Sequence, residues 1–154
     1  SYTTLINKSP DFATAKGFLE EMKKLGLKPD EFSYTTLINK SPDFATAKGF
    51  LEEMKKLGLK PDEFSYTTLI NKSPDFATAK GFLEEMKKLG LKPDEFSYTT
   101  LINKSPDFAT ANGFLEEMKK LGLTPNEVSY TTLINKSPDF ATAKGFLEEM
   151  KKLG

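Results

Sequence analysis

The sequence predicts an all-α fold, a right-handed solenoid of stacked αα-hairpins with about five repeats. A 32-residue repeat, SYTTLINKSPDFATAKGFLEEMKKLGLKPDEF, occurs unchanged at residues 1–32, 33–64 and 65–96, with a fourth copy at 97–128 and a partial copy at 129–154. A repeat of this length is typical of solenoids, whose repeats bury their apolar faces only against their neighbours. Each repeat also holds two stretches with apolar residues at helical spacing. We therefore expect one repeat array over residues 1–154. The fourth copy departs from the others at Asn112, Thr124, Asn126 and Val128.

The first predicted helix of each hairpin crosses the repeat boundary. Asp30 can cap its N-terminus, and the helix is expected to run from about Glu31 to Lys40. Because successive residues of a helix are about 100° apart, one face collects the apolar side chains and should be buried: Tyr34, Leu37 and Ile38. The opposite face collects Phe32, Thr35, Thr36, Asn39 and Lys40.

The second predicted helix is expected to begin at Ser9 as its cap, with Pro10 in the first helical position. It is expected to be about 16 residues long. Gly26 followed by Leu27 indicates a left-handed C-terminus. Gly17 lies inside this helix, which predicts a close approach to another helix as compensation for its low helix propensity. The predicted apolar arc comprises Phe12, Ala15, Phe18, Leu19, Met22 and Leu25.

The composition excludes several classes of function. The chain has no Cys, His, Trp, Arg or Gln, so it has no disulfide, no thiolate or imidazole metal site and no Ser-His or Cys-His catalytic pair. The Glu20-Glu21 pair recurs identically in every repeat, whereas a catalytic carboxylate needs one unusual environment. We therefore expect no enzyme and no cofactor. No apolar run approaches the roughly 20 residues of a membrane span, so no membrane partner is expected, and a soluble, intracellular protein is favoured.

Three segments recur in the same order in every complete repeat: YTTLI at residues 34–38, FLEEM at 50–54 and GLKPD at 58–62. In this combination the sequence resembles the pentatricopeptide repeat family along its whole length. The repeat is about three residues shorter than the usual one of that family. The missing turn falls at the end of the first helix, which puts the spacing of successive repeats in question.

The resemblance implies binding of single-stranded RNA, with one base recognised per repeat. In the family, two side chains per repeat choose the base, and by its code this chain would select G-G-G-A. The implied pairs are Thr3 with Asp30, Thr35 with Asp62, Thr67 with Asp94, and Thr99 with Asn126. The implied base-stacking residues are Phe32, Phe64, Phe96 and Val128. The lysines expected to contact phosphates are Lys8, Lys40, Lys72, Lys104 and Lys136.

Each of these residues also has a purely structural interpretation. Phe32 could cover the joint between repeats or staple the helix start. The Asp and Asn residues could serve only as helix caps, and a helical Thr can bond its own backbone. Lys23 and Lys24 follow Glu20 and Glu21 at helical spacing, which predicts pairing within the helix. The formal net charge is zero, which indicates weak RNA binding.

The alternative function is a protein- or peptide-interaction scaffold, natural or consensus-designed, with no nucleic-acid ligand. Neither end of the repeat array carries a polar capping helix, and exposed apolar faces of a solenoid need cover. End-to-end association of identical chains is therefore also expected. The residues expected to seek cover are Tyr2, Leu5 and Ile6 at one end and Met150 and Leu153 at the other.

Overall fold

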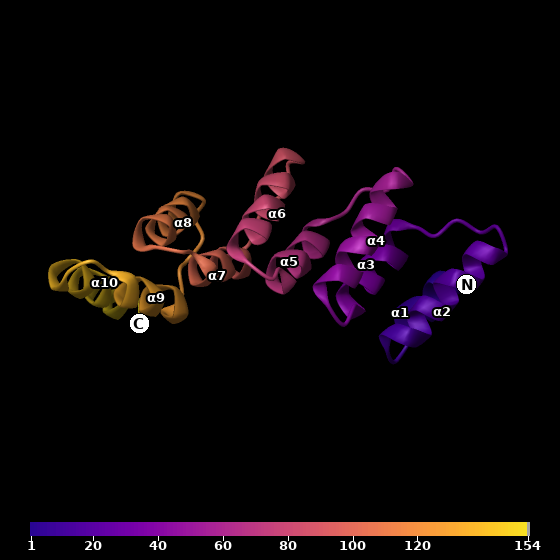
Figure 1. Cartoon of the computed structure of the whole chain (residues 1–154), viewed down its shortest axis with the longest axis horizontal. Coiled ribbons are helices and arrows are strands. Elements are labelled where there is room, and N and C mark those ends of the chain that lie inside the picture. The colour runs from indigo at the N-terminus through magenta and orange to yellow at the C-terminus, as the bar shows by residue number, and fades with distance from the viewer. Residues whose placement is uncertain (154) are drawn as a thin grey trace. The chain divides into compact units, whose positions relative to one another are not determined.

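The computed structural model describes residues 1–153, which contain ten α-helices and no strand (Figure 1). The chain divides into two compact units, here called the N-terminal unit (Ser1–Lys72) and the C-terminal unit (Ser73–Gly154). The all-α helical-hairpin repeat fold predicted from the sequence is confirmed. The helices are α1 (Tyr2–Lys8), α2 (Phe12–Lys24), α3 (Glu31–Lys40), α4 (Phe44–Lys56), α5 (Glu63–Lys72), α6 (Phe76–Lys88), α7 (Glu95–Lys104), α8 (Phe108–Lys120), α9 (Glu127–Lys136) and α10 (Phe140–Lys152).

The two units share one packing scheme. In the N-terminal unit, α1 packs on α2 and α3, and α3 packs on α4 and α5. In the C-terminal unit, α6 packs on α7, α7 on α8 and α9, and α9 on α10. Within each unit, consecutive first helices therefore contact each other, and the short loops make the two helices of a hairpin neighbours.

The first helix of each hairpin follows the sequence prediction. Asp30 caps α3, and its carboxylate accepts the backbone N–H of Ser33. The predicted stripe is fully buried: Tyr34, Leu37 and Ile38 are each 0% exposed. The same positions are buried in α5 and α7. Full burial of an aliphatic side chain contributes about 1.5–3 kcal/mol, so Leu37 and Ile38 stabilise the packing of α3 on its neighbours.

The second helix begins later than predicted. It spans 13 residues, Phe12–Lys24, and its cap is Asp11, whose Oδ1 accepts the Thr14 N–H at 2.8 Å. Ser9 instead ends α1, where its hydroxyl donates to Leu5 O at 2.7 Å. The prediction of Ser9 as the cap and of a 16-residue helix was wrong, because the serine hydroxyl serves the preceding helix and the aspartate two residues later supplies the cap.

The predicted C-terminus of the second helix is confirmed. Gly26 has a φ of 75°, a left-handed conformation that favours glycine. The Gly26 N–H donates to Lys23 O and the Leu27 N–H to Met22 O, each at 3.0 Å, which is the Schellman pattern. Leu25 was placed on the buried arc but is 61% exposed, because it lies at the cap, beyond the last full turn that packs.

The glycine inside the second helix does not mark a close helix approach. A Cβ built on Gly17 would meet no atom within 4 Å, and Gly17 is exposed. The same holds for Gly49, Gly81 and Gly113. The expected compensation for its low helix propensity was therefore wrong. The buried side of this helix is carried by Ala15, Leu19 and Met22.

The residues expected to seek cover fall into two groups. Ile6 is 0% exposed because it lies inside its own hairpin. The prediction that Ile6 is exposed and needs cover was therefore wrong. Leu5 and Leu153 are 46% and 53% exposed. Tyr2 and Met150 are half-buried.

Within the described residues, no helix combines the length and hydropathy that a membrane span requires.

Candidate functional site

The predicted aromatic row is exposed to solvent. In the N-terminal unit Phe32 and Phe64 are 62% and 61% exposed, and in the C-terminal unit Phe96 and Val128 are 62% and 51% exposed. Each is the second residue of its helix and points away from the buried Tyr stripe. The interpretation that these rings cover the joints between repeats was therefore wrong. The exposed rings of Phe32, Phe64 and Phe96 each leave a π-face available to a ligand, whereas Val128 offers only an aliphatic side chain.

A surface hollow of about 440 Å³ brings one predicted pair together in the N-terminal unit. Thr35 of α3 and Asp62, the residue just before α5, both line it. Phe32 forms part of the same wall. Asp30 and Glu31 add two further carboxylates. The sequence prediction thus named four of the residues that meet here, and it missed Glu31, Leu59 and Lys60.

A matching hollow of about 460 Å³ lies in the C-terminal unit, where Asp94, Glu95, Phe96 and Asn126 line it. Thr99 is held beside it: its Oγ1 donates to Glu95 O at 2.9 Å and lies 3.3 Å from Ser129 Oγ. The interpretation of the threonine as a backbone-bonding residue therefore applies to Thr99.

A buried serine connects each cap to the preceding repeat. Asp30 Oδ1 accepts from Ser33 N at 2.9 Å and from Ser33 Oγ at 3.0 Å, and Ser33 Oγ also lies 3.4 Å from Thr3 Oγ1. Ser33 is 0% exposed. The sequence reasoning missed this serine, although its place three residues after the cap is where a capping bond is expected. Ser65 and Ser129 repeat the arrangement.

The capping bond decides which polar group each cap residue has left for a ligand. In Asp30 both bonds from Ser33 reach Oδ1, which leaves the second carboxylate oxygen, Oδ2. In Asn126 the bonds from Ser129 N and Ser129 Oγ also reach Oδ1, at 3.0 and 3.3 Å, which leaves the amide Nδ2. An Asp cap therefore offers an acceptor, and an Asn cap offers a donor.

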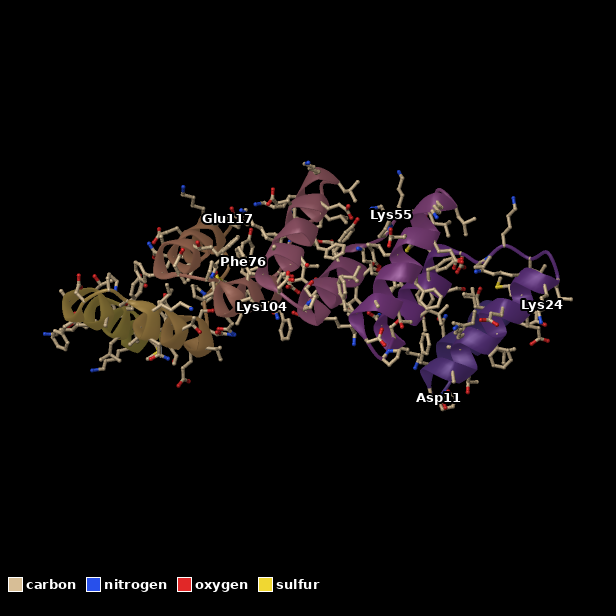
Figure 2. All side chains as sticks on the ribbon, in the orientation of Figure 1. Asp11, Lys24, Lys55, Phe76, Lys104 and Glu117 are labelled. Atoms are coloured by element: carbon tan, nitrogen blue, oxygen red, sulfur yellow. The ribbon has the colours of Figure 1, made fainter. Side chains whose placement is uncertain are left out.

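Four of the five predicted phosphate-binding lysines lie near carboxylates. Lys8 is exposed, and the other four are half-buried. Of these four, the N-terminal unit holds Lys40 and Lys72, and the C-terminal unit holds Lys104 (labelled in Figure 2) and Lys136. The pKa of Asp43 is lowered chiefly by the bonds from Thr46, and the Lys72 charge lowers it further. Asp11, Asp75 and Asp107 have the corresponding lysine neighbours. The neighbouring carboxylates offset part of the positive charge of the lysine row.

The second helices are joined by ion pairs between consecutive repeats. Lys23 Nζ lies 2.6 Å from Glu53 Oε1, and Lys119 Nζ lies 2.7 Å from Glu149 Oε1. The prediction that Lys23 pairs within its own helix was therefore wrong, because the packing of consecutive hairpins brings a glutamate of the next repeat closer. Lys16 does pair within its helix, with Glu20 at 3.9 Å.

A buried tyrosine completes this network in the C-terminal unit. Tyr98 is 0% exposed, and its hydroxyl donates to Glu117, which also accepts from Lys87 Nζ at 2.9 Å (Glu117 is labelled in Figure 2). Burial raises the pKa of Tyr98, and the Glu117 charge raises it further. The three residues tie α6, α7 and α8 together.

Among residues 1–153, no cluster of His, Cys, Asp or Glu has the composition of a metal site.

Comparison with solved structures shows the same fold in pentatricopeptide repeat proteins. The PPR domain of Arabidopsis thaliana protein-only RNase P 1, solved in complex with tRNA, has a TM-score of 0.81 and 19% identity, with 98% of this chain and 86% of that chain covered. The maize protein PPR10 has a TM-score of 0.67 and 27% identity, with 99% of this chain covered. This chain spans only 24% of the PPR10 chain.

A second PPR10 structure, in complex with an 18-nucleotide psaJ RNA element, has a TM-score of 0.66 and 23% identity, with 99% of this chain and 28% of that chain covered. No curated protein matches the sequence. The family profile described as the pentatricopeptide repeat domain matches residues 17–73, 49–104 and 81–137. These matches overlap and extend over most of the sequence, so the chain belongs to the pentatricopeptide repeat family.

Proposed function

We propose that this chain binds single-stranded RNA through the hollows beside its first helices, with one base per repeat and a preference for G-G-G-A. The observation that carries the proposal is the hollow of the N-terminal unit, where an exposed ring, Phe32, lies with the hydroxyl residue Thr35 and the cap residue Asp62. A base in this hollow could stack on the ring while its edge meets the polar pair.

The capping bonds give this base preference a chemical reason. The free Oδ2 of an Asp cap is an acceptor, and guanine presents N–H donors on its Watson–Crick edge. The free Nδ2 of Asn126 is a donor, and adenine presents a ring-nitrogen acceptor on that edge. Because the cap takes Oδ1 in both cases, capping and base recognition use different atoms of the same side chain. A cap can therefore also recognise a base.

The remaining assignments extend the same scheme to the other repeats. Thr3 with Asp30 and Thr99 with Asn126 repeat the Thr–Ser–cap arrangement that the structure has within each unit. Thr67 and Asp94 belong to different units, so that pair stays a prediction. The lysines assigned to phosphates are Lys8, Lys40, Lys72, Lys104 and Lys136. Solved relatives in complex with RNA add support for the ligand class.

The test is a binding titration with three labelled RNAs: a single strand containing GGGA, poly-U, and a duplex containing the same sequence. We expect the GGGA strand to bind best at low salt. The sharper test is Asp62→Asn, which keeps the cap and changes only the free atom. This variant should bind a strand containing GAGA about tenfold more tightly than one containing GGGA, a difference of ~1.4 kcal/mol. Asp43→Asn, a cap outside the hollow, should leave the base preference unchanged. Equal or absent binding of all three RNAs would overturn the proposal.

A further inference from the structure

One face of the last hairpin is apolar and uncovered. On α10, Phe140 is 80% exposed and Leu147 is 38% exposed. The equivalent of Leu147 in α8, Leu115, is 0% exposed because the next hairpin covers it. On α1, Leu5 is 46% exposed, whereas its equivalent in α3, Leu37, is 0% exposed. Each of these residues thus belongs to a contact that is complete elsewhere in the same chain.

The interior joints show what a complete contact contains. In the N-terminal unit, the earlier hairpin supplies three residues, Asn7, Phe12 and Lys23, and the later hairpin supplies their partners. Thr36 Oγ1 donates to Asn7 Oδ1 at 2.5 Å, the Phe50 ring meets Phe12 edge-on at 5.9 Å, and Glu53 accepts Lys23 at 2.6 Å.

The joint between the last two hairpins repeats every one of these contacts. Thr132 donates to Asn103 at 2.5 Å, Phe146 meets Phe108 at 5.9 Å, and Lys119 pairs with Glu149 at 2.7 Å. The contact set is therefore a property of the repeat sequence and not of one place in the chain.

The two uncovered faces carry the two halves of this set. The α9/α10 hairpin presents Asn135, Phe140 and Lys151, which occupy the positions of Asn7, Phe12 and Lys23. The α1/α2 hairpin presents Thr4, Phe18 and Glu21, which occupy the positions of Thr36, Phe50 and Glu53. Donor faces acceptor, cation faces anion and ring faces ring when the two hairpins are placed in the register of an interior joint.

We propose that the α9/α10 hairpin binds the α1/α2 hairpin of a second copy of this chain, head to tail, in the register of the interior joints. The occupant is a second copy because its surface matches the uncovered face residue by residue. Such a contact joins two different surfaces, so each bound copy leaves one further face uncovered and assemblies can grow beyond dimers. No loop such as Leu25–Asp30 connects two separate copies, so the association depends on concentration.

The test is sedimentation of the 154-residue chain over a range of protein concentrations. The average mass should rise above the 17.2 kDa of one chain as concentration increases. Phe140→Asp blocks the α10 face and Leu5→Asp blocks the α1 face, and each variant alone should remain monomeric. The Phe140→Asp variant keeps an intact α1 face, and the Leu5→Asp variant keeps an intact α10 face. Mixed in equal amounts, the two variants should therefore form a one-to-one dimer that does not grow further.

Three results would overturn the proposal: a monomer at every concentration, growth of the Phe140→Asp variant alone, or a mixture that stays monomeric. Circular dichroism of each variant should show unchanged helix content, since both positions are exposed. As a second variant set, Lys151→Glu should weaken the association and Glu21→Lys in the partner should restore it. Phe32→Asp, an exposed ring on another surface, should leave the association unchanged while it weakens RNA binding, so the two proposals fail independently.

Discussion

The Thr36 hydroxyl donates a hydrogen bond to Asn7 Oδ1 at 2.5 Å and so joins α3 to α1 across 29 residues of sequence. Thr36 and Asn39, the equivalent of Asn7, were expected on the polar face of the first helix. This bond instead fixes the distance between successive first helices, because a buried or half-buried bond of this kind contributes about 1 kcal/mol and holds one geometry. Thr35, the neighbour of Thr36, faces the hollow. A bond between repeats therefore lies directly beside the proposed base site.

Two glycines, one inside α4 and one just after its end, should respond to alanine in opposite directions. Gly58 has a φ of 78°, so Gly58→Ala should lower the free energy of unfolding by about 1 kcal/mol. Gly49 is helical and exposed, with no atom within 4 Å of a Cβ, so Gly49→Ala should raise it by about 0.5–1 kcal/mol. Urea unfolding of the two variants measures both values. A loss of stability in Gly49→Ala would show that the small side chain serves a contact.

Acid should destabilise the second helices through their caps. The pKa of Asp43 is lowered from 3.8, chiefly by the bonds from Thr46. A lowered pKa in the folded state means that the stabilising contribution is present above the unfolded value and is lost as the pH falls through the folded value. Stability should therefore decline below about pH 4. Asp43→Asn keeps an acceptor for Thr46 and removes the titration.

Urea unfolding at a series of pH values between about 5 and 2 tests this prediction. The Asp43→Asn variant should show a shallower decline than the unchanged protein. The pKa is also lowered at the equivalent caps, Asp11, Asp75, Asp107 and Asp139. The prediction therefore also requires a stepwise flattening as further caps are replaced, and a slope that stays constant would contradict it.

The repeat pattern was sufficient to predict the all-α hairpin fold and the first helix to the residue. Asp30 directly precedes that helix, and Tyr34, Leu37 and Ile38 form a clear stripe, so local propensity and pattern agree. The start of the second helix was wrong because SPD offers two cap residues, Ser9 and Asp11. Sequence alone does not rank the two residues. In the structure the Ser9 hydroxyl bonds Leu5 O at the end of α1, and Asp11 caps α2.

The candidate site was predicted in composition but not in its connections. Phe32, Thr35 and Asp62 were named from the family resemblance, and they share one hollow. The Ser33 bridge and the Lys23–Glu53 pair were missed, because each joins residues 30 positions apart. Contacts across that distance follow from the way hairpins stack, which no local pattern in a helix reveals.

The buried tyrosines should resist ionisation until the protein unfolds. Burial, together with the smaller effect of the Glu149 charge, raises the pKa of Tyr130 from 10.0 to about 12. A raised pKa in the folded state means that the stabilising contribution is complete below pH 10 and is lost as the pH rises toward 12. The unfolding midpoint in urea should therefore fall across this interval.

Absorbance of tyrosinate measures the same effect directly. Between these pH values the folded protein should show less tyrosinate than the protein in concentrated urea. Tyr130→Phe should remove one ionising group from the late part of the folded titration and leave the early part unchanged. A folded titration that coincides with the unfolded one would show that Tyr130 is accessible to solvent.

Lys72 and Asp43 should affect RNA binding in opposite directions, given the proposed function. Lys72 is assigned to a phosphate, so Lys72→Ala should weaken binding and reduce the slope of log K against log salt by about 0.7. The Asp43 carboxylate faces the Lys72 charge, and Asp43→Asn removes that competitor while it keeps the cap. Asp43→Asn should therefore tighten binding at low salt, and the gain should shrink as salt rises because the effect is electrostatic.

Lys24→Ala, at an exposed lysine outside the assigned row (Figure 2), is the control and should leave the slope unchanged. Equal slopes for Lys72→Ala and Lys24→Ala would mean that the RNA phosphates do not follow the lysines of the first helices.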